Sequence, residues 1–118
     1  MGAPHGALTV LHDFDGQDDG GVPSELVRDA KGNLYGATND GGDTNCDGIN
    51  GCGEIFKIAT DGSFKRLHAF VGTDGEAPAA GPLIGPNGYL YGTTSGGGNA
   101  SCTYGGVGGC GVVFEIKE

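Results

Sequence analysis

Short apolar segments separated by turn residues run the whole length of the chain. Within each segment apolar and polar residues tend to alternate, and Gly, Asp, Asn or Pro bounds the segment on either side. This is the pattern of short antiparallel strands. No stretch keeps an apolar stripe at the helical period, and no apolar run reaches the roughly 18 residues that cross a bilayer. The pattern therefore predicts an all-β fold without membrane insertion.

One stretch of the sequence occurs twice. Residues 34–42 read LYGATNDGG and residues 90–98 read LYGTTSGGG, 56 positions further on. An apolar–aromatic pair followed by glycine and threonine indicates a short strand that passes close to another backbone. The same register extends over nearly the whole chain, which is typical of repeat architectures. The sequence thus predicts two repeats, residues 3–58 and 59–118.

Each repeat contains four segments of strand type, which begin at Thr9, Glu25, Leu34 and Gly53 in the first repeat and at Lys65, Pro82, Leu90 and Gly111 in the second. Residues 31–33 and 87–89 are short hairpin connections built on glycine and asparagine. Four short antiparallel strands joined as a meander are the make-up of one propeller blade. The expected fold is two tandem four-stranded propeller-type blades.

Longer matching segments carry a resemblance to a known family. The segments LHDF, DGGVP, KGNLYGATNDGG and GCGEIFKI, with LHAF, DGEAP, PNGYLYGTTSGGG and GCGVVFEI in the second repeat, resemble the GloVer tandem repeat of secreted bacterial proteins. The resemblance covers nearly the whole chain and implies a propeller-type β array within a large extracellular protein. It supplies no catalytic residues. Ala37 departs from the LYGTT core, and two repeats stand where the family runs many.

Composition and charge exclude several classes of partner. The chain has 118 residues, 27 of them glycine, and a formal net charge of −9 with six basic residues. Nucleic acids and anionic membrane surfaces both require clustered Lys and Arg, so neither is an expected partner. An acidic surface is compatible with bound cations, although its simplest role is solubility.

The four cysteines bracket one Gly-rich loop in each repeat. Cys46 and Cys52 lie in the first loop, and Cys102 and Cys110 lie in the second. Four cysteines allow three pairings, and the local pairing within each loop is favoured because each loop begins and ends beside the same two strands. A shared zinc site is the rival, but its ligand pairs usually stand closer together in sequence. Disulfides predict an extracellular or cell-surface protein.

The first of these loops also fits a calcium pattern. It reads D-x-N-x-D-G followed by five residues and a glutamate, which places the oxygen ligands at Asp43, Asn45, Asp47 and Glu54. Calcium prefers such hard oxygen ligands. The corresponding loop of the second repeat lacks the acidic residues and is not expected to bind. The alternative for the first loop is an ordinary hairpin loop closed by a disulfide.

The residues that could suggest catalysis have a simpler explanation in the repeat and in the strand pattern. His12 and His68 occupy the same repeat position, which favours a structural role because a catalytic residue is rarely needed once per repeat. Residues 106–111 match G-x-G-x-x-G, but a strand-type segment follows where the dinucleotide fingerprint needs a helix. We therefore expect a protein that is not an enzyme.

Two blades cannot close a propeller ring, since rings run from about four to eight blades. We expect homo-oligomers, a trimer first, with a tetramer or a filament as alternatives. The apolar positions expected to face a neighbouring blade are the pairs Leu34/Leu90, Phe14/Phe70 and Phe56/Phe114. The expected function is that of a non-catalytic structural or assembly module.

The alternative function is a glycan- or ligand-binding, lectin-like propeller module. It would use pockets between blades and the tyrosines Tyr35, Tyr91 and Tyr104. Tyr104 is the best single candidate for a ligand contact because it breaks the repeat and lies in a loop.

Overall fold

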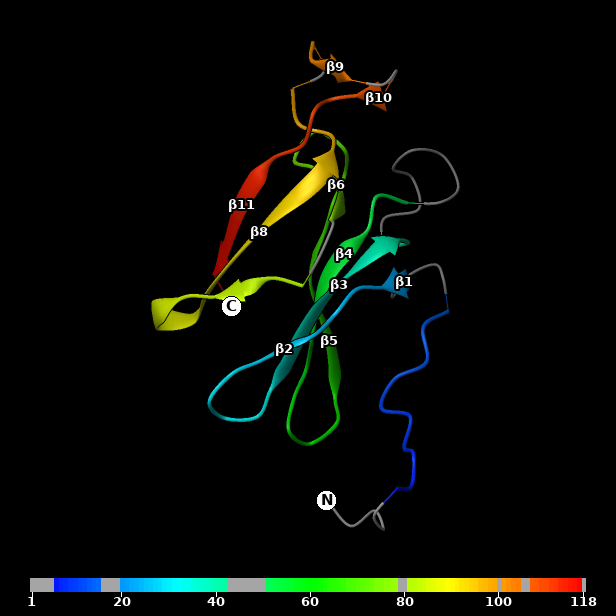
Figure 1. The fold of residues 1–118 in the computed structure, drawn as a ribbon, viewed down its shortest axis with the longest axis vertical. Coiled ribbons are helices and arrows are strands. Elements are labelled where there is room, and N and C mark those ends of the chain that lie inside the picture. Colours follow the sequence, from blue (N-terminus) through cyan, green and yellow to red (C-terminus); the bar gives the residue numbers. More distant parts are fainter. Residues whose placement is uncertain are drawn as a thin grey trace.

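The computed structural model describes residues 6–15, 20–42, 51–78, 81–99, 101–104 and 107–117. Within these residues the chain forms two main antiparallel sheets, a two-stranded ribbon and one three-residue 3-10 turn at Pro86–Gly88. Figure 1 shows the two sheets next to each other. The predicted all-β fold is thus confirmed. None of the described segments forms a helix that is both long and apolar enough to span a membrane.

The first sheet is an antiparallel meander that follows chain order. β1 (Gly21–Pro23) and β2 (Val27–Arg28) lie along the same edge of β3 (Leu34–Asp40). β3 pairs with β4 (Glu54–Ile58), which in turn pairs with β5 (Phe64–Ala69). Because β1 and β2 share one edge of β3, they act as a single interrupted strand, and the sheet has four strand positions.

The second sheet repeats this arrangement with one difference. Its strands are β6 (Glu76–Pro78), β7 (Leu83–Ile84), β8 (Tyr89–Gly96) and β11 (Val113–Lys117). β6 and β7 share one edge of β8, and β11 pairs with the other edge. Among the described strands, no counterpart of β5 lies beyond β11. β9 (Thr103–Tyr104) and β10 (Val107–Gly108) form the separate ribbon.

Equivalent atoms make equivalent hydrogen bonds in the two sheets. The Thr38 hydroxyl oxygen accepts a hydrogen bond from the Glu54 N–H at 3.1 Å. In the second sheet the Thr94 hydroxyl oxygen accepts one from the Val112 N–H, also at 3.1 Å. The short strands agree as well, since Pro23 pairs with Thr38 as Pro78 pairs with Thr94. The sequence repeat is therefore a repeat of backbone geometry.

A glycine is required immediately before this threonine contact in both sheets. Gly53 has a φ of +91° and Gly111 has a φ of +99°, and residues other than glycine rarely adopt a backbone conformation of this kind. A Cβ atom at either position would lie 2.3 Å from the carbonyl oxygen of the facing threonine, Thr38 or Thr94. These two close approaches explain why the last glycine of the GCG triplet recurs in both repeats.

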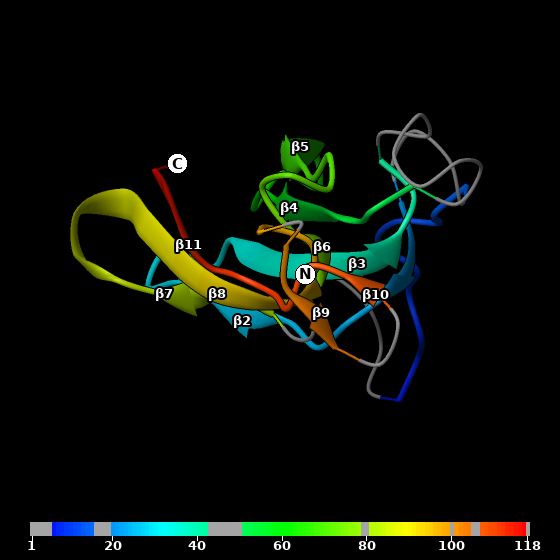
Figure 2. The same ribbon diagram turned by 90° about the horizontal axis from the view of Figure 1, so that it is seen from above.

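The segment of residues 9–14 differs from its prediction. Its counterpart in the second repeat forms β5, yet residues 9–14 are in no strand. A strand exists through its ladder partner, and β5 has β4 beside it, whereas residues 9–14 pair with no described strand. Figures 1 and 2 show residues 6–15 and the second sheet on opposite sides of the first sheet.

The hydrophobic core lies between the two sheets. Its buried members are Tyr35, Ala37, Cys52, Ile55, Phe70 and Leu90, with Val27, Leu67, Phe114 and Ile116 packed against them. The first sheet and the residues beside it supply most of the fully buried members, and the second sheet closes the core with Leu90 and its neighbours. The two sheets therefore stabilise each other through one shared layer.

Candidate functional site at the faces of the sheets

Each sheet has two faces, because successive side chains of a strand point to opposite sides. We call one the leading face, made by Leu34, Phe56 and Ile58 in the first sheet and by Leu90, Phe114 and Ile116 in the second. We call the other the trailing face, made by Val27, Tyr35, Ala37 and Ile55 in the first sheet and by Leu83, Tyr91, Thr93 and Val113 in the second. The core joins the trailing face of the first sheet to the leading face of the second.

Aromatic packing marks this internal contact. Phe70, directly after β5, is 1% exposed and meets Phe114 edge to face, with ring centroids 5.3 Å apart and planes at 63°. A backbone hydrogen bond from the Ala77 N–H to the Cys52 carbonyl oxygen, at 2.8 Å, also joins the two sheets. Such edge-to-face pairs contribute beyond their buried area. The first sheet thus holds the leading face of the second through the residue that follows β5.

The leading face of the first sheet is covered in the same way by the N-terminal segment, residues 8–14. Phe14 meets Phe56 edge to face, with centroids 5.2 Å apart and planes at 62°. His12 also stacks on Phe64 at 4.0 Å. The ring geometry of Phe14 on Phe56 reproduces that of Phe70 on Phe114. The N-terminal segment therefore occupies, on the first sheet, the place that β5 and Phe70 occupy on the second.

The trailing face of the second sheet, by contrast, is open. Ile55 is 0% exposed in the first sheet, whereas its counterpart Val113 is 82% exposed, and Leu83 is 71% exposed. Leu83, Tyr91, Thr93 and Val113 line a hollow of about 250 Å³ on this face. Glu115 is the cross-strand partner of Tyr91, and the interaction of its carboxylate with the tyrosine hydroxyl raises the pKa of Tyr91 above its ordinary value. An open apolar face of this kind normally marks an interaction surface.

A second, more polar pocket of about 340 Å³ lies between the hairpin at residues 29–33 and the start of β8. Asp29 organises it by accepting hydrogen bonds from the Lys31 and Asn33 N–H groups at 2.9 Å, the Asn33 side-chain amide at 3.0 Å and the Tyr35 hydroxyl at 3.2 Å. The bond from the Asn33 side chain, with those from the backbone and from Tyr35, lowers the pKa of Asp29. Tyr89 lines the opposite wall. The Asp29 carboxylate is thus already well supplied with donors.

Three of the four predicted calcium ligands, Asp43, Asn45 and Asp47, lie outside the described residues. Glu54 lies in β4 and is 0% exposed. Across the described part of the chain, no group of three or more His, Cys, Asp or Glu side chains is placed to hold a metal ion. The calcium site therefore remains a prediction.

The position of Glu54 is still informative, because Val112 occupies it in the second sheet. A Cβ atom on Gly20 would lie 3.0 Å from Glu54 Oε2, and one on the equivalent Gly75 would lie 3.1 Å from Val112 Cγ2. The first repeat therefore buries a carboxylate where the second repeat places a methyl group.

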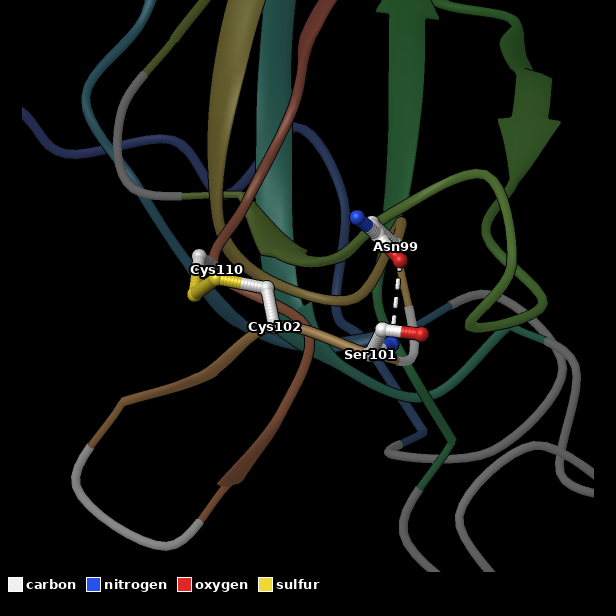
Figure 3. Close-up of a disulfide and its surroundings, with 4 residues drawn as sticks. All are labelled: Asn99, Ser101, Cys102 and Cys110. Carbon is white, nitrogen blue, oxygen red and sulfur yellow. Dashed lines mark hydrogen bonds between the residues drawn. A yellow bond between two sulfur atoms is a disulfide. The ribbon is translucent and has the colours of Figure 1, made fainter.

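The predicted disulfide of the second loop is confirmed. Cys102 and Cys110 are bonded, with their Cα atoms 5.7 Å apart (Figure 3). In the same loop the Ser101 N–H donates to the Asn99 side-chain oxygen at 2.9 Å. Cys52 is also disulfide-bonded and 1% exposed, while its predicted partner Cys46 lies outside the described residues. The second loop is thus closed at its base by a covalent bond.

The tyrosines proposed as ligand contacts fall in different surroundings. Tyr35 is 1% exposed, so its ring cannot form a platform for a sugar. Tyr91 is half-buried on the open trailing face. Tyr104 lies in β9 of the ribbon, and its side chain is outside the described part of the structure. Sequence reasoning missed the Asp29 pocket, which no repeated motif marks because the counterpart of Asp29 is Gly85.

Comparison with known families gives one result. A family model described as the Gloeobacter/Verrucomicrobia repeat matches residues 2–118. Neither the curated proteins nor the solved structures that were compared with the chain contain a match to it.

Proposed function

The chain belongs to the Gloeobacter/Verrucomicrobia repeat family, and we propose that it is a non-catalytic assembly module of an extracellular protein. In this proposal each sheet is one propeller blade, and copies of the chain join head to tail into a closed homo-oligomer or a filament. The observation that carries the proposal is the contrast between Ile55, which is 0% exposed, and its counterpart Val113, which is 82% exposed. The trailing face is covered in the first sheet and open in the second.

The internal contact supplies the template for the contact between copies. Within one chain, the trailing face of the first sheet packs on the leading face of the second. Repeating that step places the open trailing face of one copy against the leading side of the first sheet of the next copy, beside the N-terminal segment that already packs on Phe56 there. Each copy adds two blades, so three copies make six blades and four copies make eight, within the usual range of propellers. A rotation that does not close gives a filament.

Hydrophobic burial drives this step, and charge opposes it. At ~25 cal/mol per Å², covering about 400 Å² of apolar surface would contribute ~10 kcal/mol before the entropy cost of association. A formal charge of −9 on every copy repels the next one. Salt screens this repulsion, so assembly should become tighter as ionic strength rises. The trimer is the favoured closed form.

The disulfide supports the extracellular part of the proposal. The bond between Cys102 and Cys110 closes a loop in a small domain, and such bonds persist mainly in oxidising compartments. A rigid loop at the end of a sheet suits a module that is exposed outside the cell.

Native mass spectrometry of the unmodified chain and of two variants at one site tests the proposal. The unmodified chain should give a mass three times 11.7 kDa, or another closed multiple. Val113→Glu should give the single-chain mass because it places a charge on the face to be buried, while Val113→Ile keeps the face apolar and should keep the assembly. A single-chain mass for the unmodified protein at micromolar concentration would exclude the proposal.

A lectin-like module is the second candidate, and the pocket between the hairpin and β8 favours it. Lys31, Lys57 and Tyr89 line this pocket of about 340 Å³, which offers donors and an aromatic ring to a hydroxyl-rich ligand. It ranks second because the Asp29 carboxylate is already bonded within the protein. A glycan array would test it: binding that Tyr89→Ala abolishes would support the pocket, and an array without binding would exclude it.

A further inference from the structure

We infer that the N-terminal segment of one copy completes the second sheet of the neighbouring copy, by adding residues 8–13 as a strand to the free edge of β11. This inference rests on the proposed head-to-tail assembly and names the surface that holds it together. The occupant is a second copy of this chain.

The packing of the segment is the first argument. Phe14 meets Phe56 at 5.2 Å and 62°, as Phe70 meets Phe114 at 5.3 Å and 63°. Phe70 directly follows β5, which belongs to the sheet preceding Phe114 in space. Phe14 has the same contact with the first sheet. The residues just before Phe14 should therefore form a strand of another sheet, one that packs in front of the first sheet as the first sheet packs in front of the second. The segment thus already lies where the last strand of a preceding sheet belongs.

The free edge of β11 is the second argument. β4 is paired on both sides, by β3 and by β5, whereas its counterpart β11 pairs with β8 alone among the described strands. An edge of this kind presents unpaired N–H and C=O groups to another strand. The strand position missing beside β11 is the one that β5 fills beside β4. Residues 8–13 are the repeat equivalent of β5.

Transferring the β4–β5 register gives the expected pairing. In the first sheet Lys57 faces Lys65 and Ile58 faces Phe64. Between copies, the corresponding partners are Glu115 with Thr9, Ile116 with Leu8, Phe114 with Val10 and Val113 with His12. The irregularity at Ile55/Phe56 leaves Leu67 as the extra residue of β5, so Leu11 would be the extra residue of the new strand.

The exposure of the segment is the third argument. Leu8 is 88% exposed and Leu11 is 56% exposed. Their counterparts are better covered, since Phe64 is half-buried and Leu67 packs against the core. Strand addition would give Leu8 and Leu11 the same cover. Apolar residues that are partly covered in one repeat and exposed in the other indicate that the segment lacks a contact that β5 has.

Cysteine cross-linking tests the pairing directly. Thr9→Cys and Glu115→Cys are made on separate chains, which are mixed and oxidised. We expect a disulfide-linked pair of chains, twice 11.7 kDa, from the mixture and little from either chain alone. Val10→Cys mixed with Glu115→Cys is the register control, because adjacent side chains point to opposite faces and should link at least ~10-fold less.

A second control calibrates the assay within one chain. Lys57→Cys with Lys65→Cys places the same pair across β4 and β5, where the structure shows direct partners. Its intrachain disulfide should form readily. If that control forms and the mixed chains give no linked product although native mass spectrometry shows an assembly, the strand pairing is wrong and the proposed function stands. If no assembly forms either, both are wrong.

Charge variants at Thr9 provide an independent measurement. Thr9 is exposed and would lie opposite Glu115, so Thr9→Glu creates a like-charge pair and Thr9→Lys an opposite one. We expect Thr9→Glu to weaken association about 2- to 5-fold and Thr9→Lys to strengthen it by a similar factor at low salt. Equal dissociation constants for the two variants would contradict the register.

Discussion

The two equivalent phenylalanines Phe14 and Phe70 give the sharpest test of how the chain is built. Phe70 is 1% exposed and packs on Phe114 within the single chain. Phe14 makes the same ring contact with Phe56 but remains half-buried. We therefore expect Phe70→Ala to act on folding and Phe14→Ala to act about equally on folding and on assembly.

The expected magnitudes follow from burial. Replacing a fully buried phenylalanine by alanine costs about 3–5 kcal/mol, so Phe70→Ala should lower the melting temperature by roughly 10–25 °C in a chain of this length. Phe14→Ala should cost the single chain about half of that, ~2 kcal/mol. The remaining ~2 kcal/mol should appear only when the neighbouring copy covers the ring, as a dissociation constant raised ~30-fold.

Two measurements separate these effects. Thermal melts followed by circular dichroism, at a concentration low enough to keep the chain monomeric, report the cost to folding. Sedimentation equilibrium at higher concentration reports association, and Phe14→Leu with Phe70→Leu serve as milder controls. Equal losses of melting temperature for the two alanine variants would show that the N-terminal segment belongs to the single-chain fold. Unchanged association of Phe14→Ala would refute its role in assembly.

Three further predictions concern the loops and the hairpin. Because hydrogen bonds lower the folded-state pKa of Asp29, its contribution to stability is present above its ordinary pKa and disappears as the pH falls through the lowered value. Asp29→Asn should therefore melt below the unmodified chain at pH 7, and in pH-dependent melts the gap should close as the pH falls below the ordinary pKa of aspartate. Replacing Cys102 and Cys110 by serine opens a loop with a sequence separation of 8 and should cost about 2.5 kcal/mol in urea denaturation; no loss would mean that the bond does not constrain the unfolded chain. Calcium should raise the melting temperature if the first loop binds it, and Asp43→Ala with Asp47→Ala should abolish the gain; a melt unaffected by chelator would leave the loop an ordinary hairpin.

The fold class and the repeat register could be predicted from the sequence because they depend on local patterns. Alternation predicts strands, and the GCG triplet recurs where the backbone has no room for a side chain, at Gly53 and Gly111. These features belong to each residue and its near neighbours. The local disulfide of the second loop could be predicted for the same reason, since its cysteines bracket one loop.

The pairing of residues 9–14 could not be predicted in this way. The sequence of this segment is as strand-like as that of β5, and the two segments occupy the same position in the repeat. Whether a strand forms depends on a partner edge, which is a property of a distant part of the chain or of another chain. Burial has the same origin, because Tyr35 and Tyr91 stand in the same motif yet differ in exposure through what covers their face. The alternation of residues along a strand shows which side chains share a face of the sheet, but it does not show what packs against that face.

Positions at which the two repeats differ locate chemistry that the shared architecture does not require. Glu54 and Val112 occupy equivalent sites, and both accommodate the same threonine contact to the backbone. Burying an ionised carboxylate costs several kcal/mol unless hydrogen bonds or a cation offset it, whereas valine at that site incurs no such cost. The fold therefore does not need the carboxylate of Glu54. Glu54 follows the loop that carries Asp43 and Asp47, whereas the second repeat lacks the acidic residues at all of these positions. The calcium prediction therefore applies to the first repeat alone, and Glu54 is the position at which the two repeats differ inside the described sheets.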